Sequence, residues 1–338
     1  MKSSIFCMLL AVSVSSCDKN CNPVGPSSSG GGASAKTQVW VTPNIGSDVV
    51  SLAAKPDEWT EARSKIDVMQ LYPGQVDQGG CIICGNSNLK NFIDVVPGGA
   101  FLWLNSQQIV FAFEAASVKD WNCGGRMPDD NVRSTSNTIR NVEMNGGRVA
   151  YIAMDEPFTA IRDNCEQPLD VTAKQVRYYI DQLKGMHPGV SIGLIEPYPY
   201  FKAEEIEEII LSLERLGVHL SFLHLDGHRH GAMADYDIPG DLRRLRDFSH
   251  NHGMDFGVLI WGDDGESNRG FASESIMTSA SIKAAIDVPD HIIIQSWSWK
   301  GGDPYAPGSR IYPDNIPENQ PYTMMWLVNE TLDYFGVR

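Results

Sequence analysis

The chain has 338 residues, of which 42% are hydrophobic and 20% charged, a balance typical of a globular protein and not of a disordered chain or a polytopic membrane protein. Its 27 Lys and Arg residues against 42 Asp and Glu residues give a formal net charge of -15. Such a surface repels phosphate backbones and anionic bilayers, so we expect no nucleic-acid partner. The length fits one large α/β domain better than two independent halves.

The first 36 residues have the pattern of an export signal followed by a tether. Residues 1–16 carry an early positive charge, an apolar stretch and small residues before Cys17, which predicts a signal peptide. Residues 14–17, Val-Ser-Ser-Cys, resemble a bacterial lipobox, which implies a lipidated Cys17; an ordinary signal peptide is the alternative. Residues 17–36 are rich in Pro, Ser and Gly and predict a flexible tether. We therefore expect a cell-envelope lipoprotein, periplasmic or surface-exposed, that contacts the membrane only through its lipid anchor.

Four cysteines belong to the domain expected over residues 37–338. Cys81 and Cys84 form a C-x-x-C pattern in a Gly-rich loop, and Cys123 and Cys165 lie in other expected loops. An exported location favours disulfides for these cysteines. A zinc site is the alternative, although no second C-x-x-C supports it.

Short apolar or β-branched runs alternate with amphipathic segments along this domain. The expected strands are residues 38–41, 66–71, 108–113, 148–154, 190–195, 220–225, 255–261 and 291–297, and the clearest helices are 171–186, 202–216, 240–252 and 321–335. Gly217 and Gly253 follow two of these helices, where a left-handed cap is needed. Eight alternations predict a single-domain, closed parallel (β/α)8 barrel of the α/β class. An open doubly wound sheet is the alternative, but no Gly-rich nucleotide-binding turn follows the first strand.

Acidic and aromatic residues recur where the apolar runs end. In chain order the candidates are Glu114, Asp155, Glu156, Glu196, Tyr198, Asp226, His228, Trp261, Asp263, Asp264, Trp297 and Trp299. Because the active site of a barrel of this kind lies at the carboxyl ends of its strands, we expect these side chains to converge there. For any single residue, the alternative is a solvent-exposed acidic side chain at the rim of the barrel without a functional role.

Carboxylates and aromatic rings without a phosphate-binding loop indicate a neutral, polyhydroxylated substrate, so the expected partner is a carbohydrate and no cofactor is expected. Glycosidic cleavage needs one carboxylic acid to protonate the leaving oxygen and a second group to stabilise or attack the anomeric carbon. Glu156 is the candidate acid, because partial burial and neighbouring carboxylates would hold its proton near neutral pH. Asp263 is the leading second carboxylate, followed by Glu196 and Asp226, and Trp261, Trp297 and Trp299 are candidate sugar platforms.

Residues 151–157, Tyr-Ile-Ala-Met-Asp-Glu-Pro, resemble the fourth-strand segment of (β/α)8 glycoside hydrolases, in which the general acid is a Glu after strand four. The large retaining clan of that superfamily implies Asn before this acid and a Glu nucleophile after strand seven; here Asp155 and the Asp263-Asp264 pair stand in those places. The adjacent Asp155-Glu156 pair also resembles substrate-assisted N-acetylhexosaminidases. That resemblance implies that Asp155 orients the sugar's acetamido group while Glu156 protonates the leaving group, with Tyr198, Trp261 and Trp297 as walls of an acetamido pocket.

Two alternatives belong to other functional classes. His224, His228 and His230 around Asp226, with Glu156 and Glu196, are metal ligands in a sugar isomerase-like or lyase-like interpretation. We expect His224 instead to point deep into the barrel as a buried, hydrogen-bonded histidine, and no metal is assigned. A catalytically silent glycan-binding lipoprotein is the second alternative. The Pro-rich segment after strand eight, residues 301–321, is either a substrate-covering loop or a packed surface loop.

Overall fold

Eight parallel strands close into a barrel in chain order in the computed structural model, and β8 pairs with β1 to complete the ring. The structure describes residues 36–46, 49–119, 128–227, 236–300 and 310–337. The strands are β1 Gln38–Thr42, β2 Val68–Leu71, β3 Val110–Ala115, β4 Val149–Asp155, β5 Ser191–Tyr198, β6 Phe222–Gly227, β7 Asp255–Ile260 and β8 His291–Gln295. The predicted (β/α)8 barrel is confirmed.

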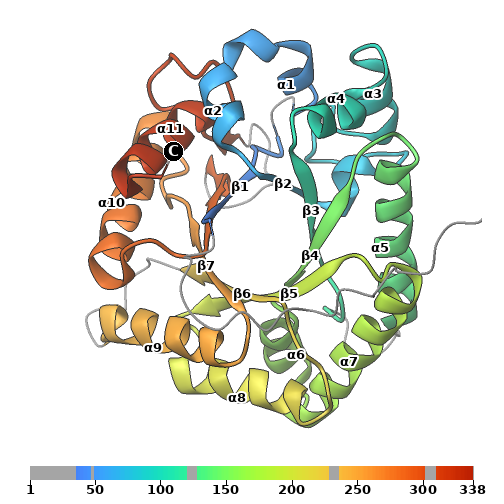
Figure 1. Cartoon of the computed structure of the whole chain (residues 1–338), viewed down its shortest axis with the longest axis vertical. Helices are drawn as coiled ribbons and strands as arrows, with labels where there is room; N and C mark the ends of the chain where they lie inside the picture. Colours follow the sequence, from blue (N-terminus) through green and yellow to red (C-terminus); the bar gives the residue numbers. More distant parts are fainter. Residues whose placement is uncertain (1–35, 47–48, 120–127, 228–235, 301–309, 338) are drawn as a thin grey trace, which may run out of the picture. The chain divides into compact units, whose positions relative to one another are not determined.

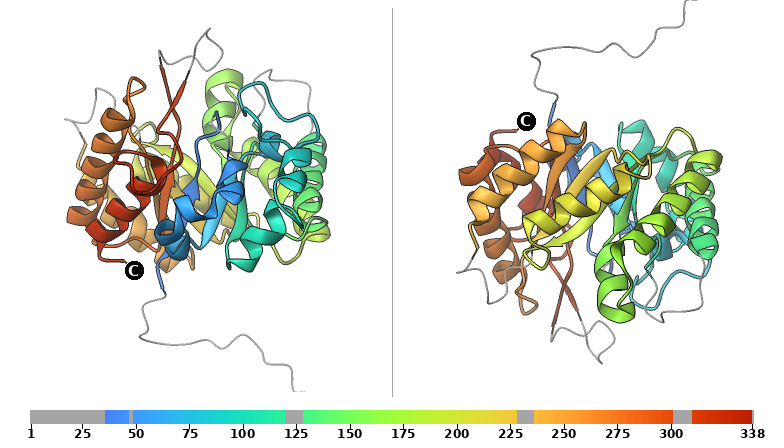
Figure 2. Two further views of the ribbon diagram at one scale, coloured as in Figure 1. Left: turned by 90° about the horizontal axis from the view of Figure 1, so that it is seen from above. Right: turned by 90° about the horizontal axis from the view of Figure 1, so that it is seen from below.

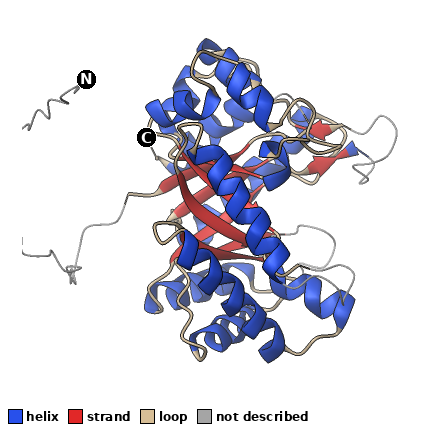
Figure 3. Cartoon of the chain, turned by 90° about the vertical axis from the view of Figure 1, so that its right-hand side faces the viewer, coloured by secondary structure: helices blue, strands red, loops and turns tan. Residues whose placement is uncertain are grey.

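Helices surround the ring of strands (Figures 1 and 3). They are α1 Ser51–Ala54, α2 Thr60–Lys65, α3 Leu89–Asp94, α4 Ala100–Ser106, α5 Pro128–Glu143, α6 Pro157–Cys165, α7 Leu169–Met186, α8 Ala203–Glu214, α9 Ile238–Asn251, α10 Asn268–Ile286 and α11 Met324–Phe335, with short 3-10 helices η1 Pro56–Glu58 and η2 Pro73–Val76. The expected helix-ending glycines have left-handed backbones, with φ of 79° at Gly217 and 73° at Gly253. No described helix is both long and apolar enough to cross a bilayer.

The expected strands overlap all eight observed strands, but β3, β5 and β6 end two or three residues later than predicted. The prediction ended these three strands just before Glu114, Glu196 and Asp226. Backbone pairing continues past that point: Pro197 pairs with Asp226, and Tyr198 with Gly227. Several of the candidate side chains are therefore held on the rigid ladder of the barrel and not on loops.

The barrel interior is a packed core and not a channel. One inward-facing cluster takes a buried residue from each strand: Trp40, Val68, Ala112, Ala153, Ile195, Phe222, Leu259 and Ile293. His224 contacts this cluster edge-on to Trp40, and its Nε2 lies 2.8 Å from Nδ1 of His291. Burial lowers the pKa of His224 well below its ordinary value, and His291 lowers it further. The expectation of a buried, hydrogen-bonded His224 is confirmed.

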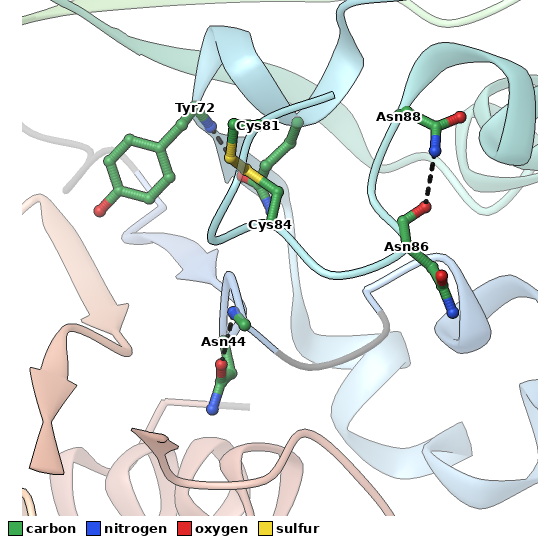
Figure 4. The surroundings of a disulfide bond; sticks show 8 residues. Asn44, Tyr72, Cys81, Cys84, Asn86 and Asn88 are labelled. Atoms are coloured by element: carbon green, nitrogen blue, oxygen red, sulfur yellow. Dashed lines mark hydrogen bonds between the residues drawn. A yellow bond between two sulfur atoms is a disulfide. The ribbon is translucent and has the colours of Figure 1, made fainter. Parts of the chain in front are cut away.

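A disulfide lies in the loop between η2 and α3. Cys81 and Cys84 are bonded, with their Cα atoms 5.1 Å apart (Figure 4). Together with Tyr72 they pack against Ile45 and Ile311. Cys165 is also disulfide-bonded, whereas Cys123 lies outside the described residues. The disulfide prediction is confirmed for these three cysteines.

The segment after β8 contains a two-stranded sheet made of β9 Ser298–Trp299 and β10 Ile311–Tyr312. This hairpin extends from the end of the barrel opposite to the start of β1, which is the end where the carboxyl ends of the strands lie (Figure 2). Residues 301–309 lie outside the described part of the chain, as do the signal and tether predicted within residues 1–35.

Candidate functional site

The carboxyl ends of β1 to β8, called the mouth below, carry the inward-facing polar residues. Side chains alternate along a strand, so the residue two positions after each interior residue points inward again. Glu114 follows Ala112 in this way, Asp155 follows Ala153 and Trp261 follows Leu259, while Asp226 follows His224. The barrel therefore brings these four predicted residues to the mouth.

Glu156 faces the same region as Asp155 although the two residues are adjacent in sequence. In a regular strand neighbouring side chains point to opposite faces. Glu156 has a left-handed backbone, with φ 43° and ψ 48°, between the end of β4 and the Pro157 that begins α6. A positive φ on a residue other than glycine is strained, and such strain concentrates at functional sites. The strained backbone turns Glu156 toward the partner that Asp155 also contacts.

That partner is Lys119, which follows β3. Its Nζ lies 2.8 Å from Oδ2 of Asp155 and 3.4 Å from Oε2 of Glu156. The exposed fractions are 10% for the Lys119 side chain, 28% for Asp155 and 18% for Glu156, so all three charges are poorly solvated. Burial alone would lower the pKa of Lys119, but Asp155 and Glu156 raise it above its ordinary value and keep the ammonium charged.

The Glu156 carboxyl has a proton affinity suited to acid catalysis near neutrality. Burial raises its pKa to about 7, with a further increase from the charge of Asp155; Lys119 acts against both, and Asp226 raises the pKa again. A group with this pKa is about half protonated at pH 7 and can both donate and accept a proton. The influence of Asp226 also shows that β6 contributes to the same electrostatic cluster as β4.

Glu114 anchors a polar network across the floor of the mouth. Its Oε2 accepts hydrogen bonds from Nε2 of Gln70 at 2.9 Å and from Nε2 of Gln295 at 3.2 Å. The Gln295 amide also donates to the Tyr72 hydroxyl at 2.7 Å. Burial raises the pKa of Glu114 well above its ordinary value, and Asp155 and Asp226 raise it further.

Sequence reasoning missed Gln70, Tyr72, Lys119 and Gln295. Gln70 is the single polar residue in the run Val-Met-Gln-Leu and is in phase with the inward-facing Val68, a signal that was present in the sequence. Lys119 lies in a loop, where periodicity carries no information about direction.

Two aromatic side chains at the mouth have defined orientations. The Trp261 indole donates from Nε1 to Oδ1 of Asp226 at 2.7 Å. Trp297 is 38% exposed, and its ring lies 5.4 Å from that of Tyr72 with an interplanar angle of 35°. Exposed rings held by neighbours in this way offer apolar faces to a ligand. The Trp299 side chain lies outside the described part of the structure.

Glu196 and Tyr198 are placed differently from the sequence-based expectation. Glu196 is fully buried and accepts hydrogen bonds from the Phe158 backbone N–H at 3.1 Å and the Thr159 hydroxyl at 3.0 Å. Tyr198 is 3% exposed and donates to Oδ2 of Asp241, near the start of α9. Both residues alternate with the inward-facing Ile195, so their side chains leave the barrel and fasten the surrounding helices. This placement does not support substrate contact for either residue.

Of the two aspartates after β7, Asp264 differs from the expectation. Asp264 accepts hydrogen bonds from the Glu266 backbone N–H and the Ser267 hydroxyl, and so closes the turn before α10. The Asp263 backbone N–H donates to Oε2 of Glu274 at 2.6 Å, and its carbonyl accepts from Ser298. The structure therefore ties Asp264 to the turn, whereas Asp226 carries the carboxylate whose charge acts on Glu156.

Only part of the alternative histidine-based metal site lies within the described residues. His224 is committed to His291, and His228 and His230 lie outside the described residues. Within the described ranges, no three His, Cys, Asp or Glu side chains gather in an arrangement suited to a metal ion.

Comparison with known proteins found no matching family model and no matching curated protein sequence. Solved structures share the fold. Native xylanase 10B from Thermotoga maritima gives a TM-score of 0.54 and covers 90% of this chain and 97% of its own at 10% identity. Xylanase 10B from Thermotoga petrophila RKU-1, in complex with xylobiose, has a TM-score of 0.53 and 11% identity, and the match covers 90% of this chain and 99% of the xylanase. A glucosidase from Croceicoccus marinus has a TM-score of 0.50 and 11% identity, and the match covers 89% of this chain and 68% of the glucosidase. The chain shares its (β/α)8-barrel fold with these three enzymes.

The Lys119→Met substitution is expected to raise the pKa of Glu156 by about 0.5 to 1 unit, because the cation that favours the ionised carboxylate is lost while Asp155 and Asp226 remain. The shift is measured by ¹³C NMR titration of labelled Glu carboxyl carbons, with Glu156 assigned by its loss in Glu156→Gln. Lys90→Met is the matched control, since Lys90 pairs with Asp94 on the exposed surface of α3. An unchanged Glu156 titration in Lys119→Met would show that the two groups are not coupled.

Proposed function

We propose that the protein is a glycoside hydrolase that cleaves a poly- or oligosaccharide, with Glu156 as general acid and base. The observation that carries this proposal is the pair of adjacent carboxylates, Asp155 and Glu156, turned onto one buried ammonium at the mouth of the barrel. Active sites of such barrels lie at this end. The fold shared with xylanases and a glucosidase supports the same class of reaction.

In the proposed reaction Glu156 gives its proton to the glycosidic oxygen as the bond to the anomeric carbon breaks. Lys119 and Asp155 position the Glu156 carboxyl through the contacts at Lys119 Nζ. Asp226 is the proposed second carboxylate, because it lies on the inward face of β6 and acts electrostatically on Glu156. Its charge would stabilise or attack the developing cationic carbon, with Trp261 fixing one of its oxygens. Tyr72 and Trp297 are the proposed sugar platforms. Asp263 stays the alternative second carboxylate.

Substrate-assisted cleavage of an N-acetylhexosaminide is a second candidate, favoured by the orientation of Asp155 toward the same group as Glu156. In that reaction the acetamido oxygen of the sugar attacks, Asp155 orients the amide, and Glu156 again acts as acid. Export by residues 1–16 and a lipid anchor at Cys17 belong to the same overall proposal.

A substrate panel tests the proposed function. Purified protein is assayed for release of nitrophenol from aryl glycosides with and without a 2-acetamido group, and for reducing ends from polymeric glycans, in the presence and absence of a chelator. We expect cleavage that the chelator does not abolish and that Glu156→Gln reduces by about 10²- to 10⁴-fold. Cleavage only of acetamido sugars would select the substrate-assisted reaction. Loss of activity in chelator would favour the metal-dependent alternative, and glycan binding without any cleavage would favour a binding module.

The control for this panel is Glu330→Gln. Glu330 is an exposed residue of α11, so the same chemical change is made outside the barrel interior. Equal loss of activity in Glu156→Gln and Glu330→Gln would contradict the role assigned to Glu156.

A further inference from the structure

The first turn of α6 is capped by a side chain from the neighbouring strand. Helix α6 lies beside β5 (Figure 1), and the Glu196 carboxyl of β5 accepts two hydrogen bonds from the start of the helix. Its Oε1 accepts from the Phe158 backbone N–H at 3.1 Å, and its Oε2 accepts from the Thr159 hydroxyl at 3.0 Å. Pro157, the first helical residue, has no N–H to satisfy. Glu196 therefore does for α6 what an N-cap side chain normally does.

This cap releases the Glu156 side chain from the helix that it precedes. Glu156 occupies the N-cap position of α6, but its side chain makes no capping hydrogen bond. A carboxylate that capped its own helix would bend back toward the backbone of the first turn and not toward the barrel mouth. With Glu196 in that role, the Glu156 carboxyl is able to contact Lys119.

Two adjacent residues of β5 hold the backbone on both sides of Glu156. The Ile195 carbonyl accepts from the Glu156 N–H at 3.1 Å, and Glu196 accepts from the Phe158 N–H. Between these two bonds Glu156 has φ 43° and ψ 48°. A positive φ is unfavourable for Glu, and the proline that follows restricts this residue further. Such a conformation persists only where the surrounding structure fixes it.

Glu196 lies in the core, with an exposed fraction of 0%, so its carboxyl is not offered to a ligand. Burial raises the pKa of Glu196 to about 8, against the hydrogen bonds from Phe158 and Thr159, and the charges of Glu156 and Asp155 raise it further. A substitution of Glu196 therefore changes two things at once: the charge near Glu156 and the cap of α6.

We infer that Glu196 is a positioning residue that acts through the first turn of α6 and holds Glu156 in the backbone conformation that directs its carboxyl toward Lys119. In this role Glu196 touches no reacting atom. The inference rests on the proposed function for the task of Glu156 as the acid. It assigns a purpose to a buried carboxyl that the proposed reaction does not otherwise use.

Titration of Glu156 tests the inference without any turnover. The pKa of Glu156 is measured by ¹³C NMR of labelled Glu carboxyl carbons in wild type, Glu196→Gln and Glu196→Leu, each with and without Lys119→Met. Gln removes the charge but keeps both hydrogen bonds, since its carbonyl accepts from the Phe158 N–H and its amide donates to the Thr159 hydroxyl oxygen. Leu removes the charge and both bonds.

We expect Lys119→Met to raise the pKa of Glu156 by about 0.5 to 1 unit in wild type and in Glu196→Gln, but by less than about 0.2 unit in Glu196→Leu. In the Leu variant the carboxyl no longer faces the ammonium. Glu196→Leu is also expected to lower the pKa of Glu156 below its value in Glu196→Gln, because the carboxyl leaves its buried position. Both variants are neutral at residue 196, so the difference between them measures the cap alone.

Hydrolysis gives a second readout. Relative to Glu196→Gln, Glu196→Leu is expected to lower kcat on substrates with poor leaving groups by about 10- to 100-fold and to change KM by less than about threefold. The acid is displaced, whereas no contact with substrate is lost. The alkaline limb of Glu196→Leu should also lie at lower pH. A merely structural role would lower the melting temperature without moving the limb or the titration of Glu156.

Thr159→Val provides the test if Glu196→Leu does not fold, because it removes one hydrogen bond at nearly constant size. It is expected to reduce the response of Glu156 to Lys119→Met by about half. Thr323→Val is the matched control, since the buried Thr323 caps α11 by accepting from the Trp326 N–H. This control should lower stability and leave the titration of Glu156 unchanged. Circular dichroism verifies folding.

An equal response to Lys119→Met in wild type, Glu196→Gln and Glu196→Leu would overturn the inference. Loss of the response in Glu196→Gln as well would assign the effect to the charge of Glu196 and would also overturn it. If Glu196→Leu does not fold, an unchanged response in Thr159→Val overturns it.

Failure of the inference is distinguishable from failure of the proposed function. Hydrolysis that Glu156→Gln abolishes, but that Glu196→Leu retains at the level of Glu196→Gln, overturns the inference alone. Loss of the response in Glu196→Leu without hydrolysis of any glycan overturns the proposed function and leaves the positioning of Glu156 standing.

Discussion

Replacing Glu156 by Gln is expected to lower kcat/KM on substrates with poor leaving groups by about 10²- to 10⁴-fold. The amide keeps the size of the side chain but has no proton to donate to the departing oxygen. A substrate such as a dinitrophenyl glycoside needs little protonation, so its first cleavage step is expected to slow less than about tenfold. The measurement compares wild type and Glu156→Gln in two assays: the rate of the initial burst of dinitrophenolate, and the steady-state rate at which a simple alkyl alcohol or phenol is released.

The pH dependence gives an independent signature of the same group. Burial and Asp155 raise the pKa of Glu156 to about 7, so wild-type kcat/KM is expected to fall with increasing pH above about 7 as the acid loses its proton. The residual activity of Glu156→Gln should lack this alkaline limb, whereas Glu330→Gln should retain it. Equal slowing of good and poor leaving groups, or an alkaline limb that persists in Glu156→Gln, would exclude Glu156 as the acid.

Replacing Asp226 by Asn is expected to cause the second large loss, of about 10³-fold or more in kcat, because the negative charge that faces the cationic anomeric carbon is removed. The Asn side chain still offers Oδ1 to the Trp261 indole, so the local hydrogen bond is preserved. The substitution also removes one of the charges that raise the pKa of Glu156. The alkaline limb of any residual activity should therefore move to lower pH, opposite to the shift expected for Lys119→Met.

Two matched aspartates serve as comparisons for Asp226→Asn. Asp264→Asn alters a carboxylate that closes the turn before α10, and it should affect stability more than the chemical step. Asp263→Asn tests the residue favoured by sequence alone. A larger loss of kcat in Asp263→Asn than in Asp226→Asn would return the role of second carboxylate to Asp263. A loss in Asp226→Asn without any shift of the alkaline limb would separate Asp226 from Glu156.

Several parts of the site follow from local sequence pattern and others do not. Asp155 and Glu114 were predicted because each ends an apolar run, and the structure shows that both are in phase with an inward-facing alanine. Glu196 was predicted on the same run-ending signal, but it is out of phase with Ile195 and fastens α6 instead. Position at the end of a strand was therefore a weaker criterion than phase along the strand.

Glu156 shows a different limit of sequence reasoning. Its selection was based on an Asp-Glu-Pro segment, yet its orientation toward Lys119 depends on a left-handed backbone that no periodic pattern encodes. Lys119 itself was not found, because a loop lysine has no preferred direction until the surrounding chain packs. Gln70 and Gln295 both donate to Glu114, and these contacts join strands far apart in the sequence.

The sequence by itself determined the class of fold and the chemical character of the mouth, because alternating apolar runs and amphipathic helices bury their apolar faces in few ways other than a closed barrel. The tertiary structure decided which polar residues act together. Barrel closure brings β8 against β1, so that Gln295, Thr42 and Gln70 become neighbours, and it sets Asp226 of β6 within electrostatic reach of Glu156 beyond β4. These relations depend on distances between strands, and such distances exist only once the chain has folded.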